Sequence, residues 1–359
     1  MALDAGWWRG KRVLVTGHTG FKGSWLAIWL QRLGAAVTGY ALPPATAPNL
    51  YDAARVGSSM DGVMGDVRDV QQLCAVMERS QPEIVLHLAA QSLVRYSFAH
   101  PRETFETNVI GTANVLEAVR QTPSVRAVVA VTSDKCYAVS AADRRHAEDD
   151  PLGGPDPYSA SKAGAELVTA GLRAALFAPR SAAGAPAIAT ARAGNVIGGG
   201  DWAMDRLLPD LLAAFAAHRP ARIRNPGAVR PWQHVLDPLR GYLLLARRLC
   251  ESGDAFAQAW NFGPPESHEK PVAWVADTAA SEFGEGARWE RDASDHPKET
   301  ATLRLDSAKA YRLLAWRTAL ALPEAIKRTT AWHRAFDAGA QARELVEREI
   351  AQYESAVNA

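Results

Sequence analysis

A tyrosine and a lysine four positions apart are the first residues whose types and spacing suggest chemistry. Tyr158 and Lys162 lie in DPYSASKAGAE, and this spacing places both on one face of a helix that begins at Asp156 and Pro157. An ammonium beside a phenol favours the phenolate and lowers the pKa of the tyrosine. Such a phenolate can accept the proton of a hydroxyl group while a hydride leaves the same carbon. The same spacing also occurs by chance on many helices.

An acid and a base lie side by side after an apolar, β-branched run. In VAVTSDKCYAV, Asp134 and Lys135 follow a predicted buried strand that ends near Val131. An isolated Asp-Lys pair is usually a solvated ion pair on a loop. At the carboxyl end of a strand in an open parallel sheet, where ligands bind, the pair could act as acid and base. Ser133 either caps the strand end or hydrogen-bonds a reacting oxygen.

Glycines at a regular spacing separate the first predicted strand from the first predicted helix. The phrase VTGHTGFKG contains Gly17, Gly20 and Gly23. A turn without side chains lets a diphosphate approach the backbone amides and the N-terminus of the helix. A purely structural turn is the alternative, but the position between strand and helix favours dinucleotide binding.

The end of the second predicted strand bears on which dinucleotide binds. A carboxylate there normally holds the ribose hydroxyls of NAD, and an arginine accommodates the additional phosphate of NADP. This strand ends in GYALPP, which contains neither. NAD is the expected cofactor because no side chain in this phrase would bind the additional phosphate of NADP. The choice between NAD and NADP stays open. Asp66 in GDVRD either accepts a hydrogen bond from the adenine amino group or caps the next helix.

These residues require a scaffold in which strands and helices alternate. Strand patterns at RVLVTG, AAVTGYAL, EIVLHLAA, RAVVAVTS and AIATARAGNVI are separated by helical patterns. This order predicts an α/β fold, with a Rossmann-type doubly wound parallel sheet and a smaller, discontinuous C-terminal substrate domain. The predicted boundaries are 1–178 for the Rossmann domain, with about 232–264 returning to it, 179–231 and 265–335 for the smaller domain, and 336–359 for a C-terminal helix.

The composition is that of a globular protein. Of 359 residues, 48% are hydrophobic, and 40 basic against 39 acidic residues give a net charge of +1. Nucleic-acid binding would require a strongly basic domain. Cys74, Cys136 and Cys250 form neither a disulfide framework nor a zinc motif. The sequence contains no signal peptide and no apolar run that could span a bilayer. We therefore expect a cytoplasmic protein without a metal, nucleic-acid or membrane partner.

Taken together, the motifs resemble the extended short-chain dehydrogenase/reductase superfamily, through the glycine turn, HLAA, Ser133 and YSASK. Within that superfamily, the sequence closely resembles the CDP-D-glucose 4,6-dehydratases. The phrases that carry this resemblance are GHTGFKGSWL, HLAAQSLVR, TSDKCY, LGGPDPYSASKAGAE, RAGNVIGGGDW, DRLLPD, RPWQHVLDPL and LRLDSAKAYRLLAW. They extend from residue 17 to about residue 330. The segment AVSAADRRHAEDD, residues 138–150, departs from the pattern of the family.

The resemblance implies a redox-neutral reaction on CDP-glucose with NAD as the cofactor. Tyr158 would take the proton of the C4 hydroxyl while the C4 hydride leaves, water would be lost across C5 and C6, and the hydride would return to C6. Asp134 would be the general acid, and Lys135 either the base or a cation that stabilises the enolate oxygen. We expect burial to favour the neutral forms of both. The alternatives are a nucleotide-sugar 4-epimerase, a 4,6-dehydratase for another nucleotide, and a noncatalytic NAD sensor.

The motifs and the resemblance together assign the site. The predicted catalytic residues are Ser133, Asp134, Lys135, Tyr158 and Lys162. The predicted cofactor-binding residues are Gly17, Thr19, Gly20, Phe21, Gly23, Asp66, Val67, Leu88, Ala89, Ala90, Tyr158 and Lys162. The predicted substrate-binding residues are Asn195, Arg206, Arg230 and Trp232. The forked arginines suit two phosphates, and Trp232 either walls the cytosine pocket or belongs to the core.

Two further expectations concern packing and assembly. Tyr137 is expected to pack beside the cofactor. The superfamily implies a homodimer formed through the helices that carry Tyr158 and the phrase TNVIGT, residues 107–112, and a tetramer is the alternative.

Overall fold

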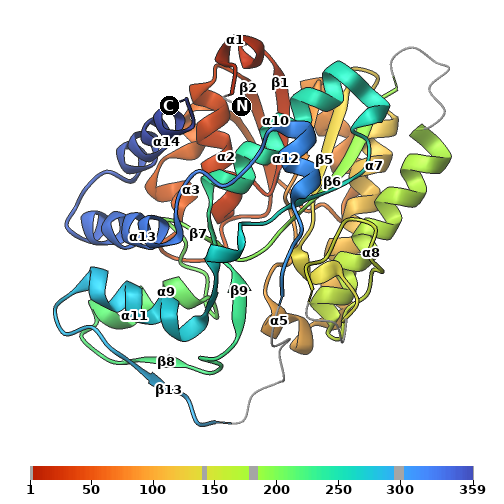
Figure 1. The fold of residues 1–359 in the computed structure, drawn as a ribbon. Coiled ribbons are helices and arrows are strands. Elements are labelled where there is room, and N and C mark those ends of the chain that lie inside the picture. Colours follow the sequence, from red (N-terminus) through yellow and green to blue (C-terminus); the bar gives the residue numbers. More distant parts are fainter. Residues whose placement is uncertain (1–2, 140–143, 178–184, 295–302, 359) are drawn as a thin grey trace.

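A parallel sheet forms the centre of the molecule (Figure 1), and the computed structural model describes residues 3–139, 144–177, 185–294 and 303–358. In spatial order, its seven strands are β11 (Ala259–Phe262), β6 (Ala187–Ala193), β5 (Ala127–Val131), β4 (Ile84–His87), β1 (Arg12–Thr16), β2 (Ala36–Ala41) and β3 (Asp61–Met64). Every neighbouring pair is parallel. The order reverses direction between β1 and β4, which confirms the predicted doubly wound α/β fold.

Helices bury both faces of this sheet. Val13 and Val15 of β1 share one core cluster with α2 (Phe21–Arg32), α10 (Leu236–Ser252) and α14 (Ala342–Asn358). Leu14, between them, belongs to the cluster on the opposite face with α4 (Val70–Ser80) and α7 (Gly111–Arg120). Successive strand residues face opposite sides, so strands covered on both sides need continuous apolar runs. This requirement explains the strand patterns in the sequence.

The helix that carries the Tyr-Lys pair begins where the sequence indicates. It is α8 (Pro157–Leu172), and the Asp156 side chain caps it by accepting a hydrogen bond from the Ser159 N–H at 2.9 Å. Pro157 occupies the first helical position, where a missing N–H costs nothing. Next to α8 lies a continuous helical segment, consisting of α6 (Pro101–Phe105), the π-turn η2 (Glu106–Ile110) and α7.

A smaller unit with its own core lies beside the carboxyl edge of the sheet (Figure 1). Its elements are α9 (Leu207–Ala216), β8 (Ala221–Ile223), β9 (Val229–Pro231), β12 (Glu269–Pro271), α11 (Val272–Phe283), β13 (Trp289–Arg291) and the first turns of α13 (Leu322–Asp337). The pairs β8–β13 and β9–β12 brace it, and the pair β7 (Val196–Ile197) with β10 (Gln233–His234) lies at its junction with the sheet.

One predicted boundary does not match this arrangement. Strand β6 lies within the range 179–231 that was predicted for the smaller domain, yet it pairs with β5 and β11 inside the large sheet. We therefore propose that the sheet domain continues through β6 and that the smaller domain begins after residue 193.

The C-terminal helix closes one side of the fold. Trp29 and Arg32 of α2 both donate to the Glu354 carboxylate of α14, at 2.9 and 3.2 Å. The remaining short helices are α1 (Ala5–Trp8), α3 (Leu50–Ala53), η1 (Val56–Ser59), α5 (Val94–Ala99), η3 (Asp134–Cys136), η4 (Arg173–Phe177), η5 (Gly253–Ala255), η6 (Glu266–His268) and α12 (Ala308–Leu314). Among the residues that the structure describes, no helix has both the length and the apolar character needed to cross a membrane.

Candidate active site

A single cavity of about 690 Å³ brings the predicted site residues together. It opens where β1, β2, β4, β5 and β6 end, and α9, β8 and β9 of the smaller unit complete its wall. Every residue that the sequence predicted for catalysis, for the cofactor or for the substrate lines this cavity. Their proximity is therefore established, whereas their individual roles stay predictions.

The glycine turn exposes backbone to this cavity because side chains would not fit. Gly17 has φ +77°, and a Cβ on it would lie 2.7 Å from the Ala89 nitrogen. A Cβ on Gly23 would lie 2.0 Å from the Gly17 carbonyl oxygen, so only glycine lets α2 begin this close to the turn. The resulting concave surface ends at the first turn of α2, which suits the diphosphate of a dinucleotide.

The adenosine end of the cavity is largely apolar. After β2, its lining consists of Ala41, Leu42, Pro43, Ala45, Thr46 and Asn49. Asp66 lies across from this wall and accepts hydrogen bonds from the Arg68 backbone and guanidinium, which hold its pKa below the usual range. The cap of α4 is Asp69, which accepts from the Gln72 N–H at 3.0 Å. The capping role considered for Asp66 is therefore wrong, and its contact with adenine stays a prediction.

The Asp-Lys pair forms the short helix η3 directly after β5. The Ser133 hydroxyl accepts a hydrogen bond from the Lys135 N–H at 3.2 Å and donates to Asp134 Oδ1 at 3.0 Å. Asp134 is 3% exposed, and its Oδ2 has no hydrogen-bond partner among the described residues. A Cβ on Gly194 would lie 2.9 Å from this oxygen.

This environment favours a protonated carboxyl. Burial raises the pKa of Asp134, and the positive charge of Lys135 and the hydrogen bond from Ser133 oppose the rise only in part. A carboxyl that keeps its proton can serve as a general acid near neutral pH. The direction agrees with the expectation that burial keeps Asp134 neutral.

The Tyr-Lys pair reaches the cavity from the first turns of α8. Burial raises the pKa of the Tyr158 phenol to about 12, although a hydrogen bond with Ser133 acts in the opposite direction. Burial lowers the pKa of Lys162 to about 8, and the Glu166 carboxylate counteracts it. The predicted lowering of the Tyr158 pKa is therefore wrong for the chain by itself, because desolvation of the phenolate has the largest effect on it.

Arginines and a tryptophan form the opposite wall. Arg206 donates to Asp201 Oδ2 and to the Ser92 hydroxyl, both at 3.0 Å. Arg230 is buried and donates to the Val229 carbonyl at 2.9 Å. Trp232 belongs to the core of the smaller unit and also lines the cavity, and its contact with cytosine stays a prediction. Asn195 also lines the cavity.

Ion pairs join the two units at the cavity wall. Asp205 accepts hydrogen bonds from Arg95 of α5 at 2.8 Å and from Arg224, just after β8, at 3.4 Å. All three residues line the cavity, and their side chains are 23–46% exposed. These contacts connect the sheet domain to the smaller unit through solvent-accessible groups.

Sequence reasoning missed two charged residues of this site. Asp201, which pairs with Arg206, was signalled only by its place in GGGDW. Lys22 lies inside the glycine turn phrase itself, between Phe21 and Gly23, and no feature of its spacing distinguishes it from a surface lysine. Burial and the nearby Arg206 lower its pKa to about 7.

Tyr137 lies away from the cavity, so the prediction that it packs beside the cofactor is wrong. Its hydroxyl accepts from Arg192 and donates to Asn261, both at 2.7 Å. Its ring stacks on His146 with centroids 4.6 Å apart, and the Arg192 guanidinium lies 4.8 Å from its centroid. Tyr137 therefore anchors the chain just after η3 to β6 and β11.

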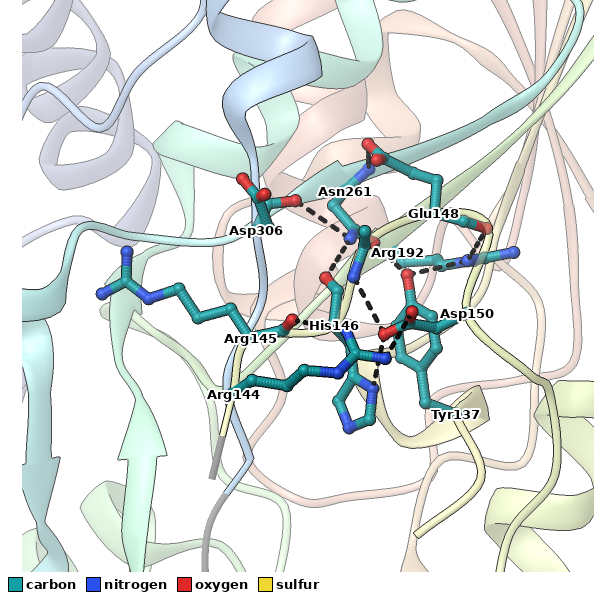
Figure 2. Close-up of polar contacts among 10 residues, drawn as sticks. Tyr137, Arg144, Arg145, His146, Glu148, Asp150, Arg192, Asn261 and Asp306 are labelled. Carbon is teal, nitrogen blue, oxygen red and sulfur yellow. Dashed lines mark hydrogen bonds and ion pairs between the residues drawn. The ribbon is translucent and has the colours of Figure 1, made fainter. Parts of the chain in front are cut away.

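The segment that departs from the family pattern belongs to this polar network (Figure 2). Arg144 and His146 both contact the Asp150 carboxylate, at 2.7 and 3.1 Å. Glu148 accepts from the Asn261 N–H at 2.9 Å, and its carbonyl accepts from Arg192. The described part of the segment, 144–150, is thus fixed to the sheet edge, and residues 140–143 lie outside the described residues.

Comparisons with known proteins assign the family. A family model described as GDP-mannose 4,6 dehydratase matches residues 14–329. This chain belongs to that family. Members that resemble it include a CDP-glucose 4,6-dehydratase of Salmonella typhimurium, which is 46% identical over 355 residues and 99% of both chains. A dTDP-glucose 4,6-dehydratase of Neisseria meningitidis serogroup B is 27% identical over 90% of this chain and 93% of its own.

Solved structures with the same fold extend to other members and to epimerases. A dTDP-glucose 4,6-dehydratase from Streptomyces venezuelae, with NAD bound, has a TM-score of 0.78 at 24% identity, over 90% of this chain and 97% of its own. A UDP-glucose-4-epimerase from Stenotrophomonas maltophila, also with NAD, has a TM-score of 0.77 at 24% identity, over 92% and 100%. At this identity, the likeness shows the fold that the family shares.

Proposed function

We propose that this chain is an NAD-dependent CDP-glucose 4,6-dehydratase, which converts CDP-D-glucose into CDP-4-keto-6-deoxy-D-glucose. The observation that carries the proposal is the buried, unpartnered Oδ2 of Asp134, which lies in the same cavity as Tyr158 and Lys162. The relative from Salmonella typhimurium, a CDP-glucose 4,6-dehydratase with 46% identity over 99% of both chains, supports the choice of nucleotide.

The chain's own residues fit NAD. The cradle that a Cβ at Gly17 or Gly23 would fill leaves room for the diphosphate, and the apolar wall after β2 suits an adenosine. Tyr158 and Lys162 would lie at the nicotinamide end. When bound, NAD accepts the C4 hydride, adds a positive charge beside the phenol, and returns the hydride to C6.

The first half of the reaction requires a proton acceptor for the C4 hydroxyl. Tyr158 is suited to this role because its phenol hydrogen-bonds Ser133 and its helix also presents Lys162. Ser133 would align the C4 oxygen, and the Lys162 ammonium would stabilise the phenolate. Oxidation of C4 to a ketone then acidifies the neighbouring C5 hydrogen.

The second half eliminates water across C5 and C6. Asp134, whose pKa is raised by burial, would donate its proton to the departing C6 hydroxyl. Lys135 acts at the same turn, either as the base that takes the C5 proton and returns it to C5 when the hydride adds to C6, or as a cation beside the enolate oxygen while this proton is exchanged with water. Together they give this site an acid and a cationic partner that a simple 4-epimerase would not need.

Incubation with NAD and with CDP-, dTDP-, UDP- or GDP-glucose in separate reactions tests the proposal. We expect a 4-ketosugar absorbance with CDP-glucose alone, and deuterium from C4 of this substrate should appear on C6 of the product. A ketosugar formed only from another nucleotide sugar would overturn the substrate assignment. Epimerised product without deuterium on C6 would identify a 4-epimerase, and binding of NAD without any turnover would identify a sensor.

We also propose a homodimer that works in the cytoplasm. Large apolar side chains are exposed on neighbouring helices, namely Leu167 of α8 (61%) and Ile110 of η2 (53%). Because α8 and η2 pack against each other, these exposed side chains suit contact with a second copy of the chain, and a tetramer stays the alternative. Cys74, Cys136 and Cys250 are unpaired, in keeping with a reducing compartment.

A further inference from the structure

Glu269 on β12 is a buried carboxylate to which the proposed mechanism assigns no role. Its side chain is 3% exposed, and two guanidinium groups lie against it, Arg145 at 3.1 Å from one carboxylate oxygen and Arg304 at 3.2 Å from the other. A buried carboxylate is costly unless such partners surround it. Figure 2 shows the Arg145 side chain pointing away from the polar network around Asn261. Arg145 therefore reaches a contact outside that network, the one with Glu269.

The sheet domain holds the backbone of both arginines. The His146 N–H donates to the Arg304 carbonyl at 3.0 Å, and the Asp306 N–H donates to the His146 carbonyl at 2.9 Å. These bonds pair His146 with Leu305 in a parallel β-bridge. The Asn261 side chain of β11 donates to the carbonyls of His146 and Asp306, at 2.8 and 3.0 Å (Figure 2). The two arginines therefore extend to β12 from chain segments that are fixed to the edge strand of the sheet.

Strand β12 in turn holds the substrate wall of the cavity. It pairs with β9 in antiparallel register, with Glu269 opposite Pro231 and Lys270 opposite Arg230. The Trp232 indole N–H donates to the Lys270 carbonyl at 3.0 Å. Arg230 and Trp232 both line the cavity. The position of β12 therefore determines where these two side chains lie.

The wall on β9 meets the sheet domain at Gly194. A Cβ on Gly194 would lie 2.7 Å from the Pro231 ring and 2.9 Å from Asp134 Oδ2, so β9 packs next to the predicted acid. A nucleotide held by this wall must place its sugar among groups that belong to the other unit. If β9 were free to shift, binding would have to order it again, at the expense of affinity.

We propose that Glu269 is a positioning residue for the nucleotide: its ion pairs with Arg145 and Arg304 fix β12, and through β12 the wall on β9, to the sheet domain. The inference rests on the proposed function. Glu269 is not one of the described residues that line the cavity, so it acts through Arg230 and Trp232. Arg145 lies in the segment 138–150 that departs from the family pattern, and this contact gives that departure a role.

The variant Glu269→Gln tests this inference, because it keeps the shape of the side chain and removes its charge. Titration calorimetry with CDP and with NAD, and KM and kcat for CDP-glucose, would be compared with those of the wild type. CDP binding should weaken and KM should rise, each about tenfold. NAD affinity and kcat should stay within about twofold, because the cofactor wall and the reacting groups lie on the sheet domain.

Glu266→Gln is the matched control. Glu266 is 87% exposed and lies 3.7 Å from the same Arg145 guanidinium, so it carries the same charge near the same partner without fixing β12. This variant should bind CDP and NAD like the wild type. A tenfold loss of CDP affinity in Glu266→Gln would show that charge near Arg145, and not the position of Glu269, is what matters, and would overturn the inference.

The outcomes separate this inference from the proposed function. Unchanged CDP affinity in Glu269→Gln, an equal loss for CDP and NAD, or a lower kcat at unchanged KM would overturn the positioning role and leave the dehydratase proposal intact. A wild type that binds neither CDP nor NAD would overturn the proposed function itself. If thermal melting shows that Glu269→Gln does not fold, Arg145→Met keeps the pair of Glu269 with Arg304 and should weaken CDP binding about three- to fivefold. Unchanged CDP affinity in that variant would overturn the inference.

Discussion

The surroundings of the two carboxyl oxygens of Asp134 determine the direction in which its pKa shifts. Ser133 donates to Oδ1 at 3.0 Å and fixes the carboxyl plane, while Oδ2 lies against the backbone of Gly194 without a hydrogen-bond partner among the described residues. Desolvation disfavours the carboxylate, and the cations nearby are too few to reverse that effect. The result is a proton held at the surface of the substrate cavity.

Replacing Asp134 by Asn separates the two halves of the reaction. The amide keeps the shape of the side chain but cannot deliver an acidic proton, so elimination should slow by about 10²- to 10⁴-fold. Oxidation of C4 should continue, and reduced nicotinamide should accumulate as absorbance in stopped-flow measurements. Equal loss of both steps would contradict the role of Asp134 as the acid of elimination.

The same side chain sets the sign of the pH dependence. Because the acid must be protonated, the elimination rate in the wild type should fall as pH rises through the raised pKa of Asp134. That decrease should disappear in Asp134→Asn, leaving the slow residual rate independent of this group.

At the scale of elements, a buried ion pair ties α8 to the sheet. Arg192 of β6 contacts Glu166 of α8 at 2.8 Å, and both side chains are 3% exposed. Glu166 also accepts from Thr132 and from Thr190, so one carboxylate joins α8, β5 and β6. Glu166 lies one helical turn from Lys162, so this ion pair supports the helix that carries Tyr158 and Lys162.

Arg192→Met should therefore destabilise the fold far more than an ordinary arginine substitution. It leaves the Glu166 carboxylate buried without its cation, which costs about 3–5 kcal/mol of unfolding free energy. Arg222→Met is the control, because the Arg222–Glu290 pair is 74% and 51% exposed and is worth less than about 1 kcal/mol. Urea denaturation measures both, and similar losses would refute the distinction.

Alanine substitutions at two glycines, one in the glycine turn phrase and one near the end of α8, should have opposite effects on stability. Gly23→Ala places a Cβ 2.0 Å from the Gly17 carbonyl, so α2 must shift, at a cost of about 1–3 kcal/mol and at least about tenfold in NAD affinity. Gly171→Ala on α8 meets no atom within 4 Å and should stabilise the fold by about 0.5–1 kcal/mol. Thermal melting and NAD titration of both variants check the contrast.

Local signals explain how much of these elements could be predicted. The turn at Gly17 and the helix of Tyr158 depend on neighbours a few positions apart, and both lie where the sequence indicates. Contacts such as Arg192 with Tyr137 join residues 55 positions apart, so no local pattern reveals them. The location of Tyr137 could not be predicted for this reason.

At the scale of the whole molecule, the exposed apolar side chains of α8 and η2 are the surface that a second copy would cover in the proposed dimer. Leu167→Glu on α8 should convert a dimer into a monomer, because a charge at the centre of such an interface lacks a partner. Light scattering after size-exclusion chromatography measures the change. Leu313→Glu on α12, which is 49% exposed and packs on the other face of the sheet, should leave the dimer intact. A monomeric wild type would refute the proposed assembly.

The ion pairs from Arg95 through Asp205 to Arg224 join the sheet domain to the smaller unit beside the cavity. Their side chains are exposed enough that dissolved ions screen them, so each pair contributes no more than about 1 kcal/mol. High salt concentration should thus weaken these ion pairs beside the cavity, whereas the buried Asp134 carboxyl should be screened much less. Ionic strength should then change the rates at which a sugar nucleotide binds and dissociates, and leave the rates of the chemical steps unchanged.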